Sequence, residues 1–117
     1  MYGVQTMVRL LQDAHGKGYA VGSFSARYTK LIRPIIAAAI KTDSPVMVQL
    51  SEKEILRHKV SLKAFADEFY QVVAELQPRI PLALHLDHTK TLEVIQEAIE
   101  VGFRSEEHTS ELQSPNT

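Results

Sequence analysis

Apolar residues follow two different periods along this chain, and the two periods alternate. Three short apolar runs have the length of β-strands. Each run is followed by a longer stretch in which apolar residues recur every three or four positions, as they do on one face of an α-helix. The runs predict strands over residues 19–24, 46–50 and 80–86. The longer stretches predict helices over residues 28–42, 61–77 and 91–101, a separate helical turn over 52–58, and an opening helix over 6–15.

The order of these elements predicts an α/β fold with a parallel sheet. When a helix follows a strand and leads into the next strand, it returns the chain to the end of the sheet where the first strand began, so the two strands are parallel. Strand–helix units follow one another through residues 19–101 with short connections, and Phe103 is expected to open a fourth strand. The pattern alone leaves open whether the sheet closes into a barrel.

Each predicted strand has one apolar face and one face that becomes polar toward its carboxyl end, because side chains alternate between the two faces of a strand. The faces that become polar carry Val21, Ser23 and Ser25 in the first strand, Met47, Gln49 and Ser51 in the second, and Pro81, Ala83, His85 and Asp87 in the third. The carboxyl ends of parallel strands meet at one edge of the sheet, where α/β enzymes place their active sites. We therefore expect the polar ends to converge. For Ser23, Ser25 or Gln49 taken alone, a purely structural explanation is favoured, because strand ends lie near solvent in any case.

The segment His85-Leu86-Asp87-His88 is the strongest candidate for chemistry. It places two imidazoles and a carboxylate within four residues at the end of an apolar strand. Such groups bind divalent metals and transfer protons. Asp87 is expected to share a face with His85, while His88, just past the strand, can turn toward a metal ion. In the structural alternative, His85 is a hydrogen-bonded core residue and Asp87 is the N-cap of the next helix.

Composition and charge narrow the class of protein. The chain has 117 residues, of which 44% are hydrophobic and 23% charged, and this fits one globular domain. A formal net charge of -1 without a Lys/Arg cluster argues against nucleic-acid and membrane-surface partners, and no apolar run approaches the roughly 20 residues that span a bilayer. We expect a cytoplasmic protein with a small-molecule partner. Because the chain has no cysteine, a metal site would need His, Asp or Glu ligands.

The segment after Phe103 differs from the rest of the chain. Residues 104–117 contain one large apolar residue, Leu112, and follow neither period. Residues 104–114 also read as the translation of a common sequencing adapter. We therefore expect a native domain over residues 1–103 that is cut short, followed by a foreign, disordered tail over residues 104–117. A natural polar tail is the alternative.

Three blocks of sequence, in order, resemble the first three strands of class II, zinc-dependent fructose-bisphosphate and related ketose-bisphosphate aldolases. The blocks are residues 18–24 (GYAVGSF), 44–51 (SPVMVQLS) and 82–88 (LALHLDH), followed by 98–103 (AIEVGF). The resemblance implies the N-terminal part of a (β/α)8 TIM barrel, about three β/α units long, with well over half of the barrel missing. It also implies reversible cleavage of a ketose bisphosphate, of the fructose- or tagatose-bisphosphate type, to dihydroxyacetone phosphate and an aldehyde, with zinc polarising the carbonyl.

The resemblance further implies roles for individual residues. Asp87 would donate and accept the proton at the hydroxyl of the breaking bond, and His88 would be a zinc ligand. Ser51 would help to bind the substrate near a phosphate group. His85 and Ser25 would be supporting neighbours. The remaining Zn2+ ligands and most phosphate contacts would lie in the missing part, and the parent enzyme would be a homodimer or homotetramer.

Two positions depart from the family pattern. The family usually has Asn where this chain has Ser25, and Arg27-Tyr28 is not a pairing typical of that loop. These departures leave the exact sugar phosphate open.

Two other interpretations also stay open. A barrel enzyme could act on a phosphosugar without metal, using Asp87 and His85 as an acid–base pair and Lys53 or Lys90 for charge stabilisation. Alternatively, the segment has no catalytic parent and is an α/β domain for binding or interaction.

Overall fold

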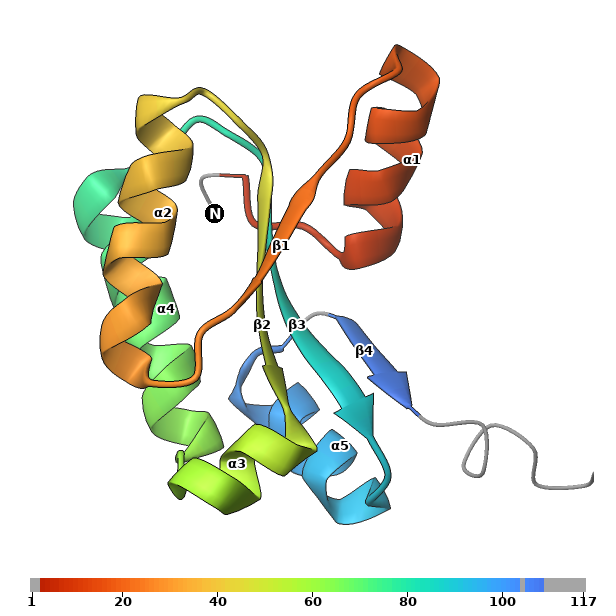
Figure 1. Ribbon diagram of the computed structural model, residues 1–117, viewed down its shortest axis with the longest axis vertical. Coiled ribbons are helices and arrows are strands. Elements are labelled where there is room, and N and C mark those ends of the chain that lie inside the picture. Colours follow the sequence, from red (N-terminus) through yellow and green to blue (C-terminus); the bar gives the residue numbers. More distant parts are fainter. Residues whose placement is uncertain (1–2, 104, 109–117) are drawn as a thin grey trace, which may run out of the picture.

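The computed structural model describes residues 3–103 and 105–108 and confirms an α/β fold built on a parallel sheet (Figure 1). The strands β1 (Gly22–Ser25), β2 (Val46–Ser51), β3 (Leu82–Thr89) and β4 (Ser105–His108) lie in this order, and each neighbouring pair is parallel. The helices are α1 (Met7–Lys17), α2 (Ile32–Lys41), α3 (Glu52–His58), α4 (Leu62–Leu76) and α5 (Leu92–Val101), and a 3-10 turn, η1 (Thr29–Leu31), precedes α2. Among the described residues, no helix has the length and apolar character needed to cross a membrane.

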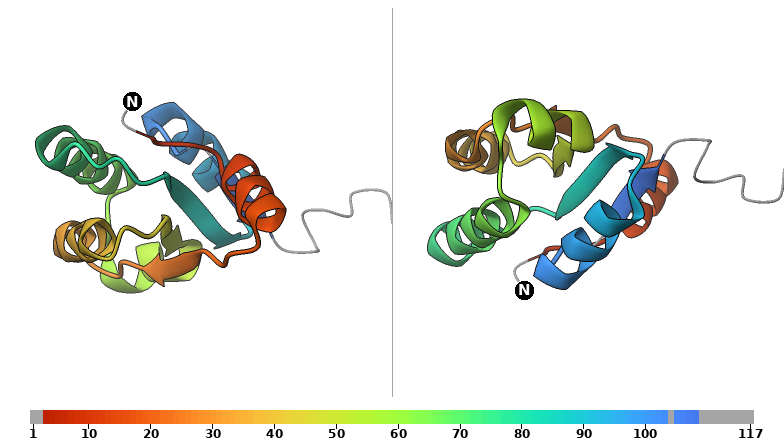
Figure 2. Two further views of the ribbon diagram at one scale, coloured as in Figure 1. Left: turned by 90° about the horizontal axis from the view of Figure 1, so that it is seen from above. Right: turned by 90° about the horizontal axis from the view of Figure 1, so that it is seen from below.

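The main hydrophobic core lies between the helices and one face of the sheet, here called the outer face. Alternate residues of the two central strands point into this core: Val46, Val48, Leu50, Leu82, Leu84 and Leu86. On the other side of the core, Phe65 and Phe69 of α4 are fully buried. Figure 2 shows α2 and α4 side by side on this face, with α5 farther along the sheet. The apolar rows predicted for the second and third strands therefore form the core.

The opposite face, here called the inner face, is covered by α1 near the amino-terminal ends of the strands. Leu10 of α1 is fully buried and packs with Met47 and Ala83 in a second, smaller apolar cluster. Figure 1 shows α1 on the other side of the sheet from α2 and α4. The polar residues at the carboxyl ends of the strands lie on the part of the inner face that α1 does not cover.

Helix boundaries largely follow the capping signals in the sequence. Ser61 caps α4 as expected, because its side chain accepts a hydrogen bond from the backbone N–H of Ala64. Gly18 ends α1 in the left-handed conformation with φ 76°. Pro34 lies in the first turn of α2, where a missing N–H does not interrupt the helix.

Two strand boundaries differ from the prediction by three residues, and the others by fewer. β1 begins at Gly22 rather than at residue 19, because Tyr19 is bound to the end of α1: its N–H donates to the carbonyl oxygen of Ala14 and its hydroxyl donates to Asp13. β3 continues to Thr89 rather than ending at residue 86, because it keeps pairing with β2 on one side and with β4 on the other.

β4 lies in the segment that the sequence sets apart. It begins at Ser105, whereas the prediction began the fourth strand at Phe103, which is buried. Residues 105–108 therefore form a strand where the sequence predicts a disordered tail. Residues 104 and 109–117 lie outside the described residues, and the foreign origin of the segment stays a prediction.

Tyr19→Phe is expected to lower the free energy of unfolding mainly between about pH 4 and about pH 10. The hydrogen bond from the Tyr19 hydroxyl, with Lys17 adding to it, lowers the pKa of Asp13, and the same hydrogen bond raises the pKa of Tyr19. A lowered carboxyl pKa stabilises the folded state above the unfolded pKa, and this stabilisation is lost as pH falls through the folded pKa. A raised phenol pKa stabilises it below the unfolded pKa, and this is lost as pH rises through the folded pKa.

Urea unfolding of the native chain and of the variant at acid, neutral and alkaline pH measures this effect. Asp13→Asn serves as the control, since it should remove the acid-side dependence. A stability difference between native and Tyr19→Phe that is as large at about pH 2 as at about pH 7 would contradict the prediction.

Candidate active site

The polar ends of β1, β2 and β3 come together on the inner face, at the carboxyl edge of the sheet. Ser25 pairs with Gln49 and Gln49 pairs with His85, so that these three residues form one row across the strands. Two residues further along, Ser51 pairs with Asp87. The structure therefore places Ser25, Ser51, His85 and Asp87, which the sequence predicts as site residues, at one edge.

Asp87 lies between the two histidines. Its Oδ1 is 4.0 Å from Nε2 of His85, and its Oδ2 is 3.7 Å from Nε2 of His88. The side chain of His85 is only 2% exposed, that of Asp87 is 16% exposed, and that of His88 is 71% exposed. The carboxylate is thus flanked by one buried and one solvent-exposed imidazole. A carboxylate with partial access to solvent beside titratable neighbours can accept a proton and return it.

Gln49 connects Asp87 to β1. Its amide nitrogen donates to Oγ of Ser25 at 3.2 Å and, over a longer distance of 3.4 Å, to Oδ2 of Asp87. Its amide oxygen accepts a hydrogen bond from the hydroxyl of Ser23. The alternation within the second strand places Gln49 on the polar face, but it is not among the predicted site residues. Its position between Ser25 and Asp87 follows from the register between strands, which the sequence of one strand does not contain.

The backbone at His88 departs from regular strand geometry. His88 lies inside β3 rather than just past it, and its φ is 44°, in the left-handed region that non-glycine residues rarely adopt. The pairing of β3 with β4 is irregular between Leu86 and Thr89. In a regular strand, consecutive residues point to opposite faces, so His88 would point away from Asp87. The irregular backbone allows the two side chains to lie close together instead.

The chain that follows β3 is tied to the start of α3. Thr91 is the N-cap of α5, where the structural alternative for Asp87 would have placed Asp87 itself. The backbone N–H of Thr91 donates to Oε1 of Glu52 at 2.9 Å. This hydrogen bond fixes the segment after His88 relative to the end of β2.

Ser51 ends β2 and caps α3. Its Oγ accepts from the backbone N–H of Glu54 at 3.2 Å, and its own N–H and hydroxyl both donate to Oε1 of Glu54 at 3.0 Å. This is a capping box, and its Ser-x-x-Glu signature can be read from the sequence. The structure therefore gives Ser51 a structural role, and its hydroxyl must leave Glu54 before it can donate to a substrate.

The polar cluster supplies one residue that is placed to bind a metal ion. His88 presents an exposed imidazole at the carboxyl edge, beside Asp87. Within residues 3–103 and 105–108, however, no group of three or more His, Cys, Asp and Glu side chains could hold a metal ion. Further ligands of a tetrahedral site would have to come from outside the described residues.

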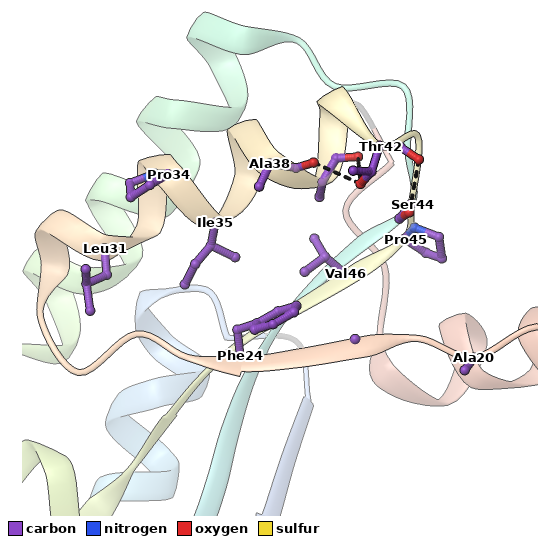
Figure 3. Close-up of a pocket in the computed structure, with 12 residues that line it drawn as sticks. Ala20, Phe24, Leu31, Pro34, Ile35, Ala38, Thr42, Ser44, Pro45 and Val46 are labelled. Carbon is purple, nitrogen blue, oxygen red and sulfur yellow. Dashed lines mark hydrogen bonds between the residues drawn. The ribbon is translucent and has the colours of Figure 1, made fainter.

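A groove of about 600 Å³ lies between β1 and α2, away from the polar cluster (Figure 3). Its walls are mostly apolar, and the close-up shows Phe24 of β1 facing Leu31 and Ile35 across it. No residue that lines it is ionisable. Because acid–base chemistry needs titratable groups, the candidate active site is the polar carboxyl edge and not this groove.

Comparisons with known proteins identify the family to which the chain belongs. A model of the protein family described as class-II fructose-bisphosphate aldolase matches residues 5–106. A sulfofructosephosphate aldolase of Alkalicoccus urumqiensis is 36% identical over 97 residues, which make up 82% of this chain and 32% of that protein. A fructose-bisphosphate aldolase of Helicobacter pylori is 34% identical over 96 residues, or 82% of this chain and 30% of that protein. The chain thus spans about a third of the length of the curated relatives it matches.

A solved structure shares the fold. The crystal structure of the YdjI aldolase from Escherichia coli K12 superposes on this chain with a TM-score of 0.74 at 22% sequence identity. The superposition covers 87% of this chain and 39% of that chain. The arrangement of strands and helices is therefore that of one part of a larger aldolase fold.

His88→Val is expected to lower the free energy of unfolding by about 1–2 kcal/mol, whereas His88→Gly should change it little. A β-branched side chain is strained at φ 44°, and glycine adopts this conformation without strain. Urea unfolding followed by circular dichroism measures both variants. Lys90→Val is the control, because Lys90 is also exposed and does not have a positive φ. If glycine destabilised as much as valine, side-chain contacts rather than backbone strain would be the cause.

Proposed function

The chain belongs to the family of class-II fructose-bisphosphate aldolases, and from this premise we propose that it supplies the first three β/α units of an enzyme that reversibly cleaves a ketose bisphosphate. The products are dihydroxyacetone phosphate and an aldehyde. The observation that carries the proposal is the position of Asp87 at the carboxyl edge of a parallel sheet, with its carboxylate between two imidazoles. Enzymes built on parallel strands assemble their active sites at this edge.

Asp87 exchanges the proton of the hydroxyl group next to the bond that breaks. In the cleavage direction, the carboxylate removes this proton, the oxygen–carbon bond becomes the carbonyl of the aldehyde product, and the carbon–carbon bond breaks. The electron pair of the broken bond stays on the other fragment as an enediolate, which takes up a proton to give dihydroxyacetone phosphate. In the condensation direction, Asp87 returns the proton to the new hydroxyl. His85 and Gln49 support this role because both lie against the carboxylate and limit its orientation.

His88 would be one ligand of a zinc ion, which would supply polarisation of the substrate's carbonyl when bound. Its exposed ring and its position beside Asp87 support this role. The other ligands belong to parts of the enzyme outside the described residues.

Two serine hydroxyls bind the substrate along the same edge. Ser25 accepts a hydrogen bond from Gln49, so its own proton can be donated to a substrate oxygen. Ser51 contacts the substrate near a phosphate group after its hydroxyl exchanges Glu54 for the ligand.

The substrate is a phosphorylated ketose. Relatives named for fructose bisphosphate and for sulfofructose phosphate support this class, and fructose- and tagatose-bisphosphate are both within it. Zinc dependence, a cytoplasmic location and a homodimeric or homotetrameric parent are further parts of the proposal.

A chimera tests the proposed reaction. Residues 5–103 of this chain replace the matching segment of the Helicobacter pylori aldolase, and cleavage of fructose bisphosphate is followed by a coupled assay. Asp87→Asn is expected to lower kcat by at least about a hundredfold, because general acid–base catalysis contributes roughly 10²- to 10⁴-fold. Asp67→Asn, which alters an exposed carboxylate of α4, is the matched control and should leave kcat unchanged. A folded chimera without activity, or an Asp87→Asn variant with full activity, would refute the proposal.

The 117-residue chain by itself is expected to have no aldolase activity and no tight zinc site. The described residues supply one zinc ligand, whereas a catalytic zinc site needs three protein ligands. The coupled assay and a zinc titration by calorimetry measure the two properties. Turnover that a chelator abolishes would show that the prediction is wrong.

A further inference from the structure

We propose that Arg27 is a specificity-determining residue that binds the anionic group at the end of the substrate farthest from Asp87 and His88. The ligand is a tetrahedral oxyanion, which is either a phosphate ester or a sulfonate. This inference rests on the proposed function, because it takes the substrate to be a sugar with such a group.

The backbone places Arg27 at the edge that carries the candidate active site. Ala26 is fully buried, and its N–H donates to the carbonyl oxygen of Gln49 at 3.0 Å, so the chain stays bound to β2 just beyond the end of β1. Arg27 is the next residue and therefore leaves the sheet at the carboxyl edge. β1 and β3 are separated by β2, so Arg27 and Asp87 start from strands that lie about two strand spacings, or roughly 10 Å, apart. A sugar phosphate that reacts at Asp87 can extend across this distance.

Contacts with α3 hold the segment that carries Arg27. Nε of Arg27 is 3.9 Å from Oε2 of Glu54, and the ring of Tyr28 lies against the ring of His58 with 5.0 Å between the ring centroids. Glu54 and His58 are four residues apart and therefore lie on the same face of the helix. Arg27 and Tyr28, which depart from the family pattern, thus dock together on one face of α3. This docking restricts the volume that the guanidinium group can occupy.

The guanidinium group has donors to offer to an anion. It carries five N–H donors in a planar fork that matches two oxygens of a phosphate or sulfonate group. The side chain of Arg27 is 68% exposed. Within the described part of the chain, Glu54 is the only carboxylate at ion-pair distance from it, and it faces Nε.

The charge of Glu54 is compensated on both sides. Its Oε1 accepts hydrogen bonds from the N–H and the hydroxyl of Ser51, and its Oε2 faces Arg27. A bound oxyanion would share Arg27 with Glu54, so Glu54 is a competitor for the guanidinium group. If Arg27 and Glu54 formed only a surface ion pair, the pair would contribute little to the stability of the protein, and the protein would not bind anions in a saturable way.

The test is an NMR titration of the ¹⁵N-labelled 117-residue chain at constant ionic strength. Inorganic phosphate and, in a separate titration, methanesulfonate are the probes, and the Nε–Hε signal of Arg27 and the backbone amides report binding. We expect a saturable shift at millimolar concentration, and we expect Arg27→Gln to weaken the binding at least about tenfold. The probe that binds more tightly identifies the phosphate or the sulfonate as the preferred group.

Three variants make the result specific. Lys30→Gln removes an exposed positive charge a few residues away and should leave binding unchanged. Arg27→Lys keeps the charge but loses the fork, so its affinity should lie between those of the native chain and Arg27→Gln. Glu54→Gln keeps the capping box, because glutamine also serves at this position, and it removes the competing charge, so binding should be tighter.

Several outcomes would overturn the inference: no saturation with either probe, equal binding by the native chain and Arg27→Gln, an equal loss in Lys30→Gln, or weaker binding by Glu54→Gln. The result is independent of the chimera experiment. An inactive chimera with intact anion binding would remove the proposed reaction, and with it the specificity role of Arg27, but not its anion binding. An active chimera without this binding would remove only the role of Arg27.

Discussion

The parallel register between β2 and β3 is the constraint on which the rest of the structure depends. Consecutive pairs from Val46 with Leu82 to Ser51 with Asp87 lock the two strands together. One set of alternate residues then lies in the core under α2 and α4, and the other set lies on the inner face with the polar residues at its end. Because side chains alternate, a shift of one residue would bring His85 and Asp87 into the apolar core and would expose the leucines. Burial of the outer face therefore also fixes the position of the polar cluster.

The site itself requires local departures from this regular pattern. The left-handed backbone at His88 brings its ring to the side of Asp87, and the hydrogen bond from Thr91 to Glu52 holds the following segment against α3. A residue in a sparsely populated backbone conformation persists only when surrounding contacts hold it there. The regular sheet supplies a fixed frame, and the irregular end of β3 arranges the groups that would do chemistry.

The sequence predicts the elements well, because their signals are local. The order of strands and helices, the N-cap at Ser61, the tolerance of Pro34 and the two faces of β2 and β3 are all confirmed. The late start of β1 was missed because it depends on the contacts of Tyr19 with α1, and the extension of β3 was missed because it depends on pairing with strands on both sides.

The roles at the site depend on contacts between distant parts of the chain, and periodicity does not contain these contacts. Gln49 reaches Asp87 only through the strand register, and Arg27 meets Glu54 only when the segment after β1 lies against α3. The capping box of Ser51 is different, because its Ser-x-x-Glu signature is local and can be recognised in the sequence. The prediction assigned Ser51 only to substrate binding and missed this structural role. The catalytic and binding roles of Asp87, His88 and Ser51 stay predictions.

The exposed position of β1 also has a consequence for how the protein is put together. Within the described residues, β1 has a sheet neighbour on one side only, and its residue Phe24 is 51% exposed at the groove. The strand pairs that hold the polar cluster lie on the other side of β1, between β1 and β2 and between β2 and β3. A contact at the open side of β1 is therefore made on the opposite edge of that strand from the polar cluster.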